Sequence, residues 1–256
     1  MTDIPDMLRA LGLRAPREAI AALLAHATKS RLSPTETCEQ LAALERRERD
    51  ARNLTARTKT ATLGPFKALD QFDWDFPRQI DRDTYELLLD LDFVAKGHNI
   101  LLRGPSGVGK STLAQNLALR AIERGHTVRF STLATMLADL LRQESLPATE
   151  RRLKRYAAPD LVVLDEIGYL PQDSRSADLL YNLVSRRHER RSTIVTTNLP
   201  FKQWNQVFPG AACVAALVDR FAQHCYVIDI DGDSWRQKSA GTPPGGPKAG
   251  KEKKKR

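Results

Sequence analysis

The sequence has few of the residues on which secreted, zinc-binding and membrane proteins depend. It contains three cysteines, at positions 38, 213 and 225, and five scattered histidines. Because the cysteines are widely spaced and odd in number, they suggest neither a disulfide framework nor a zinc site. No apolar run approaches the ~20 residues that a membrane-spanning helix needs. We therefore expect a protein without a secretory leader that works in the reducing cytoplasm.

Aromatic residues are also scarce, at 6% of the chain, yet four of them fall between residues 66 and 76. No strand pattern in this segment would place the rings on one face, as a base-stacking surface requires. We therefore expect an ordered connector that packs against the domain after it. Gly64-Pro65 interrupts the preceding helical pattern and marks the start of the connector.

Acidic residues are too few to balance the basic ones, and the formal net charge is +9. Residues 238–256 supply +6 of this charge, so the net charge by itself is weak evidence for a nucleic-acid partner. The end of the chain also lacks apolar residues to bury. We expect residues 239–256 to form a disordered basic tail.

The most informative stretch is N-I-L-L-R-G-P-S-G-V-G-K-S-T at residues 99–112. An apolar strand leads into a glycine loop, and apolar residues then recur at helical spacing. Glycines let backbone N–H groups point at an anion, and the helix start adds its positive dipole end. Lys110 can reach the β- and γ-phosphates of a nucleotide, while the Ser111 hydroxyl can bind Mg²⁺. The expected nucleotide-binding residues are Gly104, Pro105, Ser106, Gly107, Val108, Gly109, Lys110, Ser111 and Thr112.

Two acids end the buried strand L-V-V-L-D-E at residues 161–166. Asp165 is expected to share the Mg²⁺ with Ser111, and Glu166 to polarise an attacking water. A helix cap is the alternative interpretation of such an acidic pair. It is less well supported beside a complete phosphate loop.

Two further polar residues are candidates for catalysis. Asn198 follows the next strand, where its amide can hold the water or the γ-phosphate, although Asn-Leu-Pro is also an ordinary loop start. Arg220 lies in a late helix and can act as an arginine finger toward a neighbouring subunit's nucleotide. Pairing of Arg220 with Asp219 or another surface acid is the alternative.

Strands and helices alternate along the chain, which predicts an α/β fold with a parallel sheet flanked by helices. The expected strands are 100–103, 127–131, 161–166, 192–198 and 226–230, and a helix is expected over 81–94. We divide the chain into a small helical N-terminal domain (1–63), a connector (64–80), an ATPase domain (81–238) and the tail (239–256).

Basic clusters on two expected helices are candidates for DNA contacts. The alternative is a solvated helix face with ion pairs four residues apart. The candidate residues are Arg46, Arg47, Arg49, Arg52, Arg57, Lys59, Arg151, Arg152, Lys154 and Arg155.

Four stretches between residues 80 and 236 together resemble the IstB-like ATPases, helper proteins of bacterial insertion-sequence transposition. This family is similar to DnaC-type helicase loaders within the AAA+ class. The run D-E-I-G-Y-L-P is the specific part, since the phosphate loop alone fits many families. The stretches are L-L-R-G-P-S-G-V-G-K-S-T, V-V-L-D-E-I-G-Y-L-P, T-I-V-T-T-N-L-P and V-D-R-F.

The resemblance implies an AAA+ P-loop NTPase core with a five-stranded parallel sheet in the order 5-1-4-3-2. It matches Lys110 and Ser111 to the Walker A motif and the acidic pair to Walker B. Asn198 corresponds to sensor one and Arg220 to the arginine finger. The family's additional helix falls within residues 132–157, beside the second basic cluster. A lid with a second sensor arginine is not evident, and Arg236 is left unassigned.

The expected function is that of a Mg²⁺- and ATP-dependent ATPase that forms a homo-oligomer on double-stranded DNA and recruits a transposase. Contacts to phosphates from many subunits predict weak sequence preference and strong salt dependence. A replicative helicase loader with the same core is one alternative. A nucleotide-gated DNA-binding scaffold with negligible hydrolysis is another. Subunit number, ring or spiral form and the DNA footprint stay open.

Overall fold

The structure is a computed structural model that describes residues 3–168 and 173–235. The chain divides into two compact units, residues 1–60 and 61–256. Arg236 and the expected tail at 239–256 lie outside the described residues. No helix in the described ranges is both long and apolar enough to cross a membrane.

The first unit is built from helices around a small apolar core. Ala15, Ile20 and Leu44 are buried, and leucines of the surrounding helices pack against them. The longest helix starts with a capping box, in which the N–H of Ser33 donates to Glu36 and the N–H of Glu36 donates to Ser33. The helices are α1 (Ile4–Ala10), α2 (Arg17–Lys29) and α3 (Pro34–Ala61), the last of which continues into the second unit.

The second unit contains a sheet of six strands in the order β1-β6-β2-β5-β4-β3. Five of them are parallel and follow the expected order 5-1-4-3-2. The expected count of five is wrong, because Gln79 and Ile80 of the connector pair antiparallel with the end of β6. Two residues are too few to show strand periodicity in a sequence. The strands are β1 (Gln79–Ile80), β2 (Asn99–Arg103), β3 (Val128–Thr132), β4 (Leu161–Ile167), β5 (Ser192–Thr197) and β6 (Cys225–Asp231).

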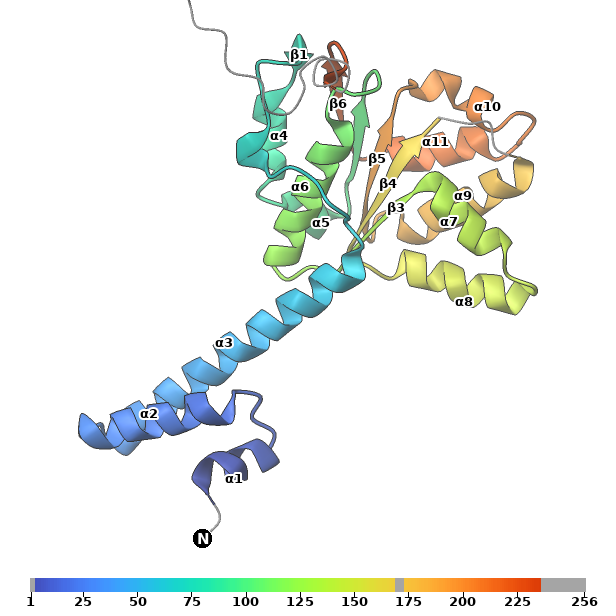
Figure 1. The fold of residues 1–256 in the computed structure, drawn as a ribbon. Coiled ribbons are helices and arrows are strands. Elements are labelled where there is room, and N and C mark those ends of the chain that lie inside the picture. The colour runs from blue at the N-terminus through green and yellow to red at the C-terminus, as the bar shows by residue number, and fades with distance from the viewer. Residues whose placement is uncertain (1–2, 169–172, 236–256) are drawn as a thin grey trace, which may run out of the picture. The chain divides into compact units, whose positions relative to one another are not determined.

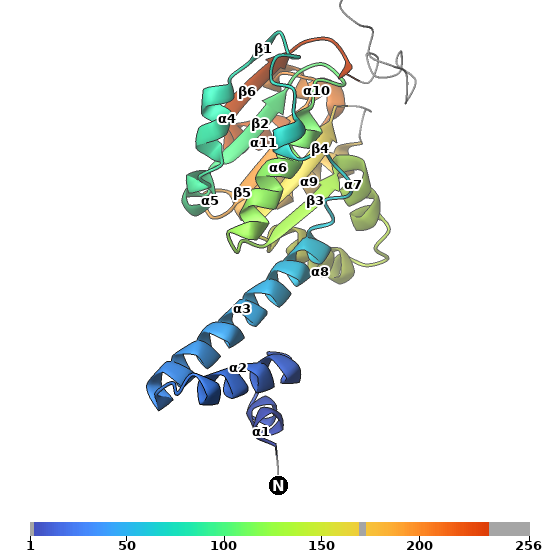
Figure 2. The same cartoon turned by 60° about the vertical axis from the view of Figure 1, so that its left-hand side comes forward.

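Helices cover both faces of this sheet, because successive strand residues point to opposite sides. Ile100 and Leu102 of β2 face one core with α4, α5 and α6, whereas Leu101 faces a second core with α7, α8, α9 and α11. Figures 1 and 2 show these two helical layers on either side of the strands. The helices are α4 (Arg82–Leu88), α5 (Asp92–Lys96), α6 (Lys110–Glu123), α7 (Leu133–Leu141), α8 (Leu146–Ala157), α9 (Ser174–Arg187), α10 (Trp204–Val207) and α11 (Val214–Ala222), with short 3₁₀ turns η1 (Leu69–Gln71) and η2 (Phe201–Gln203).

One expected helix is interrupted. The segment 81–94 forms α4 and α5 because Leu91 adopts a left-handed conformation with φ of 67°. The connector that precedes α4 is ordered, as expected. Its residues Phe66, Phe72 and Trp74 pack against the core that contains α4, α5 and α6. The rings of Phe72 and Trp74 meet edge to face with centroids 4.9 Å apart.

Candidate nucleotide-binding site

The glycine loop between β2 and α6 adopts a conformation that side chains would prevent. Gly107 and Gly109 have φ of 85° and 96°, in the left-handed region that glycine tolerates. At Gly104 the constraint is space, since a Cβ there would lie 2.1 Å from the backbone oxygen of Ile230. The loop therefore keeps its backbone open toward the cavity that it lines.

Lys110 is buried at the start of α6, with 7% of its surface exposed. Its Nζ donates hydrogen bonds to the carbonyl oxygens of Gly104 and Pro105 at 2.8 and 2.6 Å. The ammonium thus lies inside the loop. Phosphate oxygens form stronger charge-assisted bonds than neutral carbonyls, so this lysine suits an anionic ligand.

Ser111 and Asp165 meet although they are 54 residues apart in the chain: Oγ of Ser111 donates to Oδ1 of Asp165 at 2.9 Å. Asp165 is 6% exposed, and its Oδ1 also accepts a hydrogen bond from Thr196 of β5. A hydroxyl beside a carboxylate is an all-oxygen donor set, the kind that Mg²⁺ prefers. These two residues therefore fit a magnesium ion.

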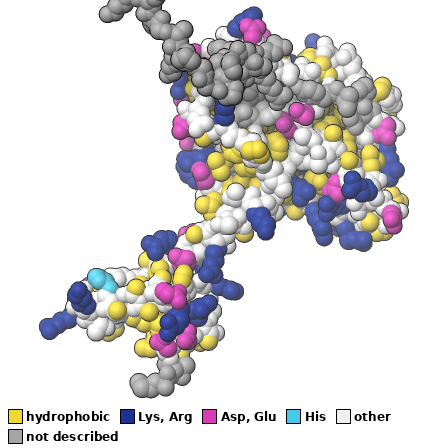
Figure 3. Space-filling model, viewed as in Figure 1, with side chains coloured by type: hydrophobic (Ala, Val, Ile, Leu, Met, Phe, Trp, Pro, Cys, Tyr) yellow, Lys and Arg dark blue, Asp and Glu magenta, His cyan; other side chains and the backbone are white. Residues whose placement is uncertain are grey.

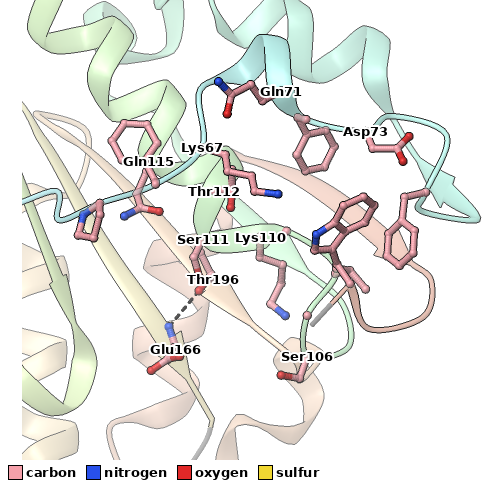
Figure 4. Close-up of a pocket in the computed structure, with 18 of the residues that line it drawn as sticks. Lys67, Gln71, Asp73, Ser106, Lys110, Ser111, Thr112, Gln115, Glu166 and Thr196 are labelled. Carbon is pink, nitrogen blue, oxygen red and sulfur yellow. Dashed lines mark hydrogen bonds between the residues drawn. The ribbon is translucent and has the colours of Figure 1, made fainter. Parts of the chain in front are cut away.

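Glu166 lies beside Asp165 in sequence but points elsewhere. Its φ is 63°, and the pairing of β4 with β5 shifts register between Leu164 and Ile167. Such a bulge redirects side chains near functional sites. Its carboxylate is exposed and lines the cavity, and its backbone N–H donates to Thr196 at 2.9 Å, the dashed line in Figure 4.

The cavity above the loop has a volume of about 350 Å³ and brings the expected segments together. Residues 106–112 of the glycine loop, Glu166 and Thr196 line it (Figure 4). The connector and the segment after β6 supply the opposite wall, which was not expected from the sequence. The wall is mainly aromatic, with Lys67, Gln71 and Asp73 as its polar members, and its rings belong to Phe66, Phe72, Phe76 and Trp235.

Two of these residues meet the loop, Phe72 through its ring and Trp235 through its backbone. A Cβ on Gly109 would be 2.5 Å from the ring of Phe72. The backbone N–H of Trp235 donates to the carbonyl of Gly107 at 3.0 Å, and its ring packs edge to face on Phe76 at 4.7 Å. The aromatic cluster at 66–76 was visible in the sequence, but nothing there indicated that the rings face the loop.

Asn198 and Arg220 do not line this cavity. Asn198 is exposed directly after β5, and Gly168 leaves room for its amide, since a Cβ there would lie 3.0 Å from Oδ1. Arg220 lies in α11 with its guanidinium 4.9 Å from the ring centre of Tyr181. Within the described ranges it forms no ion pair with Asp219 or with any other acid.

The basic residues of α8 differ in their surroundings. Arg152 is held by Asp139, with Nε 2.6 Å from the carboxylate, and Lys154 lies 3.9 Å from Glu150. Arg151 and Arg155 are exposed and have no ion pair within the described ranges. Figure 3 shows Lys and Arg side chains gathered over α8.

The first cluster lies along the polar length of α3, in the first unit. Most of its members are exposed, and Arg49 pairs with Glu45 one turn away. Glu45 also accepts hydrogen bonds from the N–H groups of Arg14 and Ala15. Arg49 therefore helps to hold the helices of the unit together. The other candidates on this helix are Arg46, Arg47, Arg52, Arg57 and Lys59.

Known proteins resemble this chain over most of its length. An insertion sequence IS21 ATP-binding protein from Pseudomonas aeruginosa is 34% identical over 238 residues, which cover 93% of this chain and 90% of that protein. An insertion sequence IS232 ATP-binding protein from Bacillus thuringiensis is 35% identical over 207 residues, covering 81% of this chain and 83% of that protein.

Solved structures with the same fold include DnaI and the replication initiator DnaA. The crystal structure of DnaI matches 64% of this chain and 90% of its own with a TM-score of 0.54 and 19% identity. AMPPCP-bound DnaA from Aquifex aeolicus matches 67% of this chain and 52% of its own with a TM-score of 0.55 and 20% identity. These similarities support the AAA+ P-loop fold. The family model described as IstB-like ATP binding protein matches residues 6–242, and the chain therefore belongs to the IstB-like family.

Proposed function

We propose that this protein is a Mg²⁺-dependent ATPase that assembles on double-stranded DNA and recruits a transposase to target DNA. The observation that carries the proposal is that Lys110, Ser111 and Glu166 line one cavity while the buried Asp165 is hydrogen-bonded to Ser111. Family membership supports the ATP part, because the relatives are named as ATP-binding proteins of insertion sequences.

ATP is the proposed ligand because the cavity has an anion-binding end and an aromatic wall. Lys110 and the N–H groups of the loop suit the phosphates, and the wall that contains Phe72 suits a flat base. Ser111 and Asp165 would hold the magnesium ion, whose charge offsets that of the phosphates.

Hydrolysis is assigned to Glu166 as the group that takes a proton from the attacking water. Its exposed carboxylate borders the cavity beside residues 106–112, and it forms no ion pair within the described ranges that would occupy it. Asn198 is assigned to orient that water from the end of β5.

Assembly is assigned to the face that carries Arg220. Its guanidinium does not border the cavity of its own chain and has no acid to neutralise it within the described ranges. A cation placed in this way suits the γ-phosphate of a neighbouring subunit. ATP would then join two subunits, and hydrolysis would loosen their contact.

DNA binding is assigned to the exposed arginines of α8, with α3 as a second basic surface. Contacts of this kind reach phosphates without reading bases, so we propose weak sequence preference and strong salt dependence. The names of the relatives, which are ATP-binding proteins of insertion sequences, support a transposase as the proposed partner.

Two alternatives stay open. A helicase loader with the same core is the first, since the similarity to DnaI at 19% identity supports the fold alone and does not distinguish the two functions. A scaffold that binds nucleotide without hydrolysing it would have the same cavity. Pull-downs of a transposase and of a replicative helicase distinguish the first alternative, and phosphate release distinguishes the second.

The proposal is tested by measuring phosphate release and particle mass with and without duplex DNA. We expect Mg²⁺-dependent release that DNA stimulates, and a shift to multimers on DNA with a slowly hydrolysed ATP analogue. A protein that stays monomeric on DNA at saturating nucleotide would contradict the assembly mechanism.

A further inference from the structure

Thr196 of β5 lies opposite an irregularity in the neighbouring strand. Between Leu164 and Ile167 of β4 the register with β5 shifts by one residue. Asp165 and Glu166 therefore face Thr196 alone, which is the two-against-one arrangement of a β-bulge. The left-handed conformation of Glu166 belongs to this bulge, and it persists only when surrounding groups hold it.

The Thr196 hydroxyl connects the two acids. The residue is buried, with 1% of its surface exposed. Oγ1 accepts a hydrogen bond from the N–H of Glu166 at 2.9 Å and donates one to Oδ1 of Asp165. A bulge deprives its extra residue of a ladder partner, so the hydroxyl supplies the acceptor that the N–H of Glu166 would otherwise lack.

We propose that Thr196 is a positioning residue for nucleotide hydrolysis, an inference that rests on the proposed ATPase function. Through the bond that it accepts, Thr196 fixes the backbone of Glu166 so that the carboxylate borders the cavity. Through the bond that it donates, it holds Asp165 against Ser111. One oxygen atom thereby sets the distance between the metal-binding acid and the hydrolytic acid.

The test compares Thr196→Val, which keeps the shape and removes the oxygen, with Thr196→Ser, which keeps the oxygen. For the full chain with duplex DNA we expect Thr196→Val to lower kcat about 10- to 100-fold, the effect of misplacing a catalytic group. Its Kd for a fluorescent ATP analogue should change less than about threefold, because Lys110 and the loop are unaffected. Thr196→Ser should keep kcat within about threefold of the parent.

Thr193→Val is the matched control on the same strand. Thr193 is 2% exposed, and its hydroxyl accepts a hydrogen bond from Nε of Arg187 at 3.0 Å, away from the cavity. Loss of this hydroxyl should lower the midpoint of thermal unfolding and leave kcat unchanged. Rates are normalised to nucleotide-binding sites, so that loss of folded protein does not count as loss of catalysis.

A double variant shows whether Thr196 acts through Glu166. If it does, Thr196→Val should slow Glu166→Gln by a smaller factor than it slows the parent, because one of the two acids that it positions is already disabled and only its bond to Asp165 is left to lose. The role of Thr196 is overturned if the parent hydrolyses ATP and Thr196→Val does so equally fast, or if Thr196→Ser is as slow as Thr196→Val. It is also overturned if the kcat reductions caused by Thr196→Val and by Glu166→Gln multiply in the double variant. A parent without turnover overturns the proposed function itself and this role with it.

Discussion

Ser111 and Asp165 share a hydrogen bond of 2.9 Å although 54 residues separate them, which brings the start of α6 to the end of β4. The bond joins a hydroxyl oxygen that lines the cavity to the carboxylate oxygen of a buried acid behind it. In an ATPase these are the atoms that share the magnesium ion. The first three predictions below concern residues assigned to nucleotide hydrolysis, and the last two concern α7 and α8.

Ser111→Ala should raise the magnesium concentration needed for half-maximal hydrolysis about tenfold or more, because it removes one of two protein ligands. A magnesium titration of phosphate release measures this. Ser111→Thr, which keeps the hydroxyl, is the control and should behave like the parent. An alanine variant with the parent's magnesium dependence would contradict the metal assignment.

Glu166→Gln should leave nucleotide binding intact and lower hydrolysis about 100-fold or more, because the amide cannot accept the proton of water. The variant should also persist as a multimer on DNA at ATP concentrations that the parent exhausts. Phosphate release and mass measurements on the same samples check both effects. If the glutamine variant turns over at the parent rate, another group is the base.

Arg220→Ala should bind nucleotide normally and hydrolyse it about 1,000-fold more slowly, the usual contribution of an arginine finger. Lys110→Ala should also be inactive. A mixture of these two variants should regain activity, since one supplies an intact loop and the other an intact guanidinium at the shared interface. Activity of the mixture no greater than the sum of the separate variants would rule out action between subunits.

Arg151→Ala and Arg155→Ala should each weaken DNA binding and reduce the slope of log K against log salt by about one. Arg152→Ala should leave this slope nearly unchanged and destabilise the fold instead, because its guanidinium pairs with Asp139. Fluorescence anisotropy with labelled duplex over a range of salt concentrations distinguishes these outcomes. If all three variants show the same slope of log K against log salt, Arg151 and Arg155 do not contact the DNA.

Asp139→Asn should destabilise the second unit at neutral pH and not in acid. Burial opposes ionisation of Asp139, but hydrogen bonds from Arg152 and Tyr156 outweigh it and lower the pKa of the carboxyl below its ordinary value. A carboxyl whose pKa is lowered by folding stabilises the folded state at pH values above its pKa in the unfolded chain. This stabilisation is lost as the pH falls through the pKa that the carboxyl has in the folded protein. We expect a loss of about 1–2 kcal/mol at pH 7 that shrinks below about pH 4.

Urea unfolding followed by tryptophan fluorescence measures this effect, since Trp74, Trp204 and Trp235 all belong to the second unit. Asp90→Asn is the matched control, at an exposed carboxylate that forms no ion pair within the described ranges. It should change stability little at either pH. Equal effects of the two variants would mean that the ion pair of Asp139 is not the cause.

The parallel strands were predictable because most are short runs rich in apolar residues, and β3 has a β-branched and aromatic content typical of strands. Their order came from the resemblance to a family, and the structure confirms it. The two-residue β1 was not predictable, since its existence depends on pairing with β6. The break at Leu91 was missed for a similar reason, because the apolar pattern continues across it.

The sequence by itself determined the phosphate loop, since Gly107, Gly109, Lys110 and Ser111 lie in one continuous segment and their roles depend on local backbone conformation. Only the tertiary structure decided what approaches that loop. Phe72 lies on Gly109 and Trp235 bonds to Gly107 because the connector and the end of β6 cross the same edge of the sheet. Likewise, Thr196 faces Asp165 and Glu166 because of the register between β4 and β5. The pattern of residues along a single strand does not specify that register when both faces of the strand are buried.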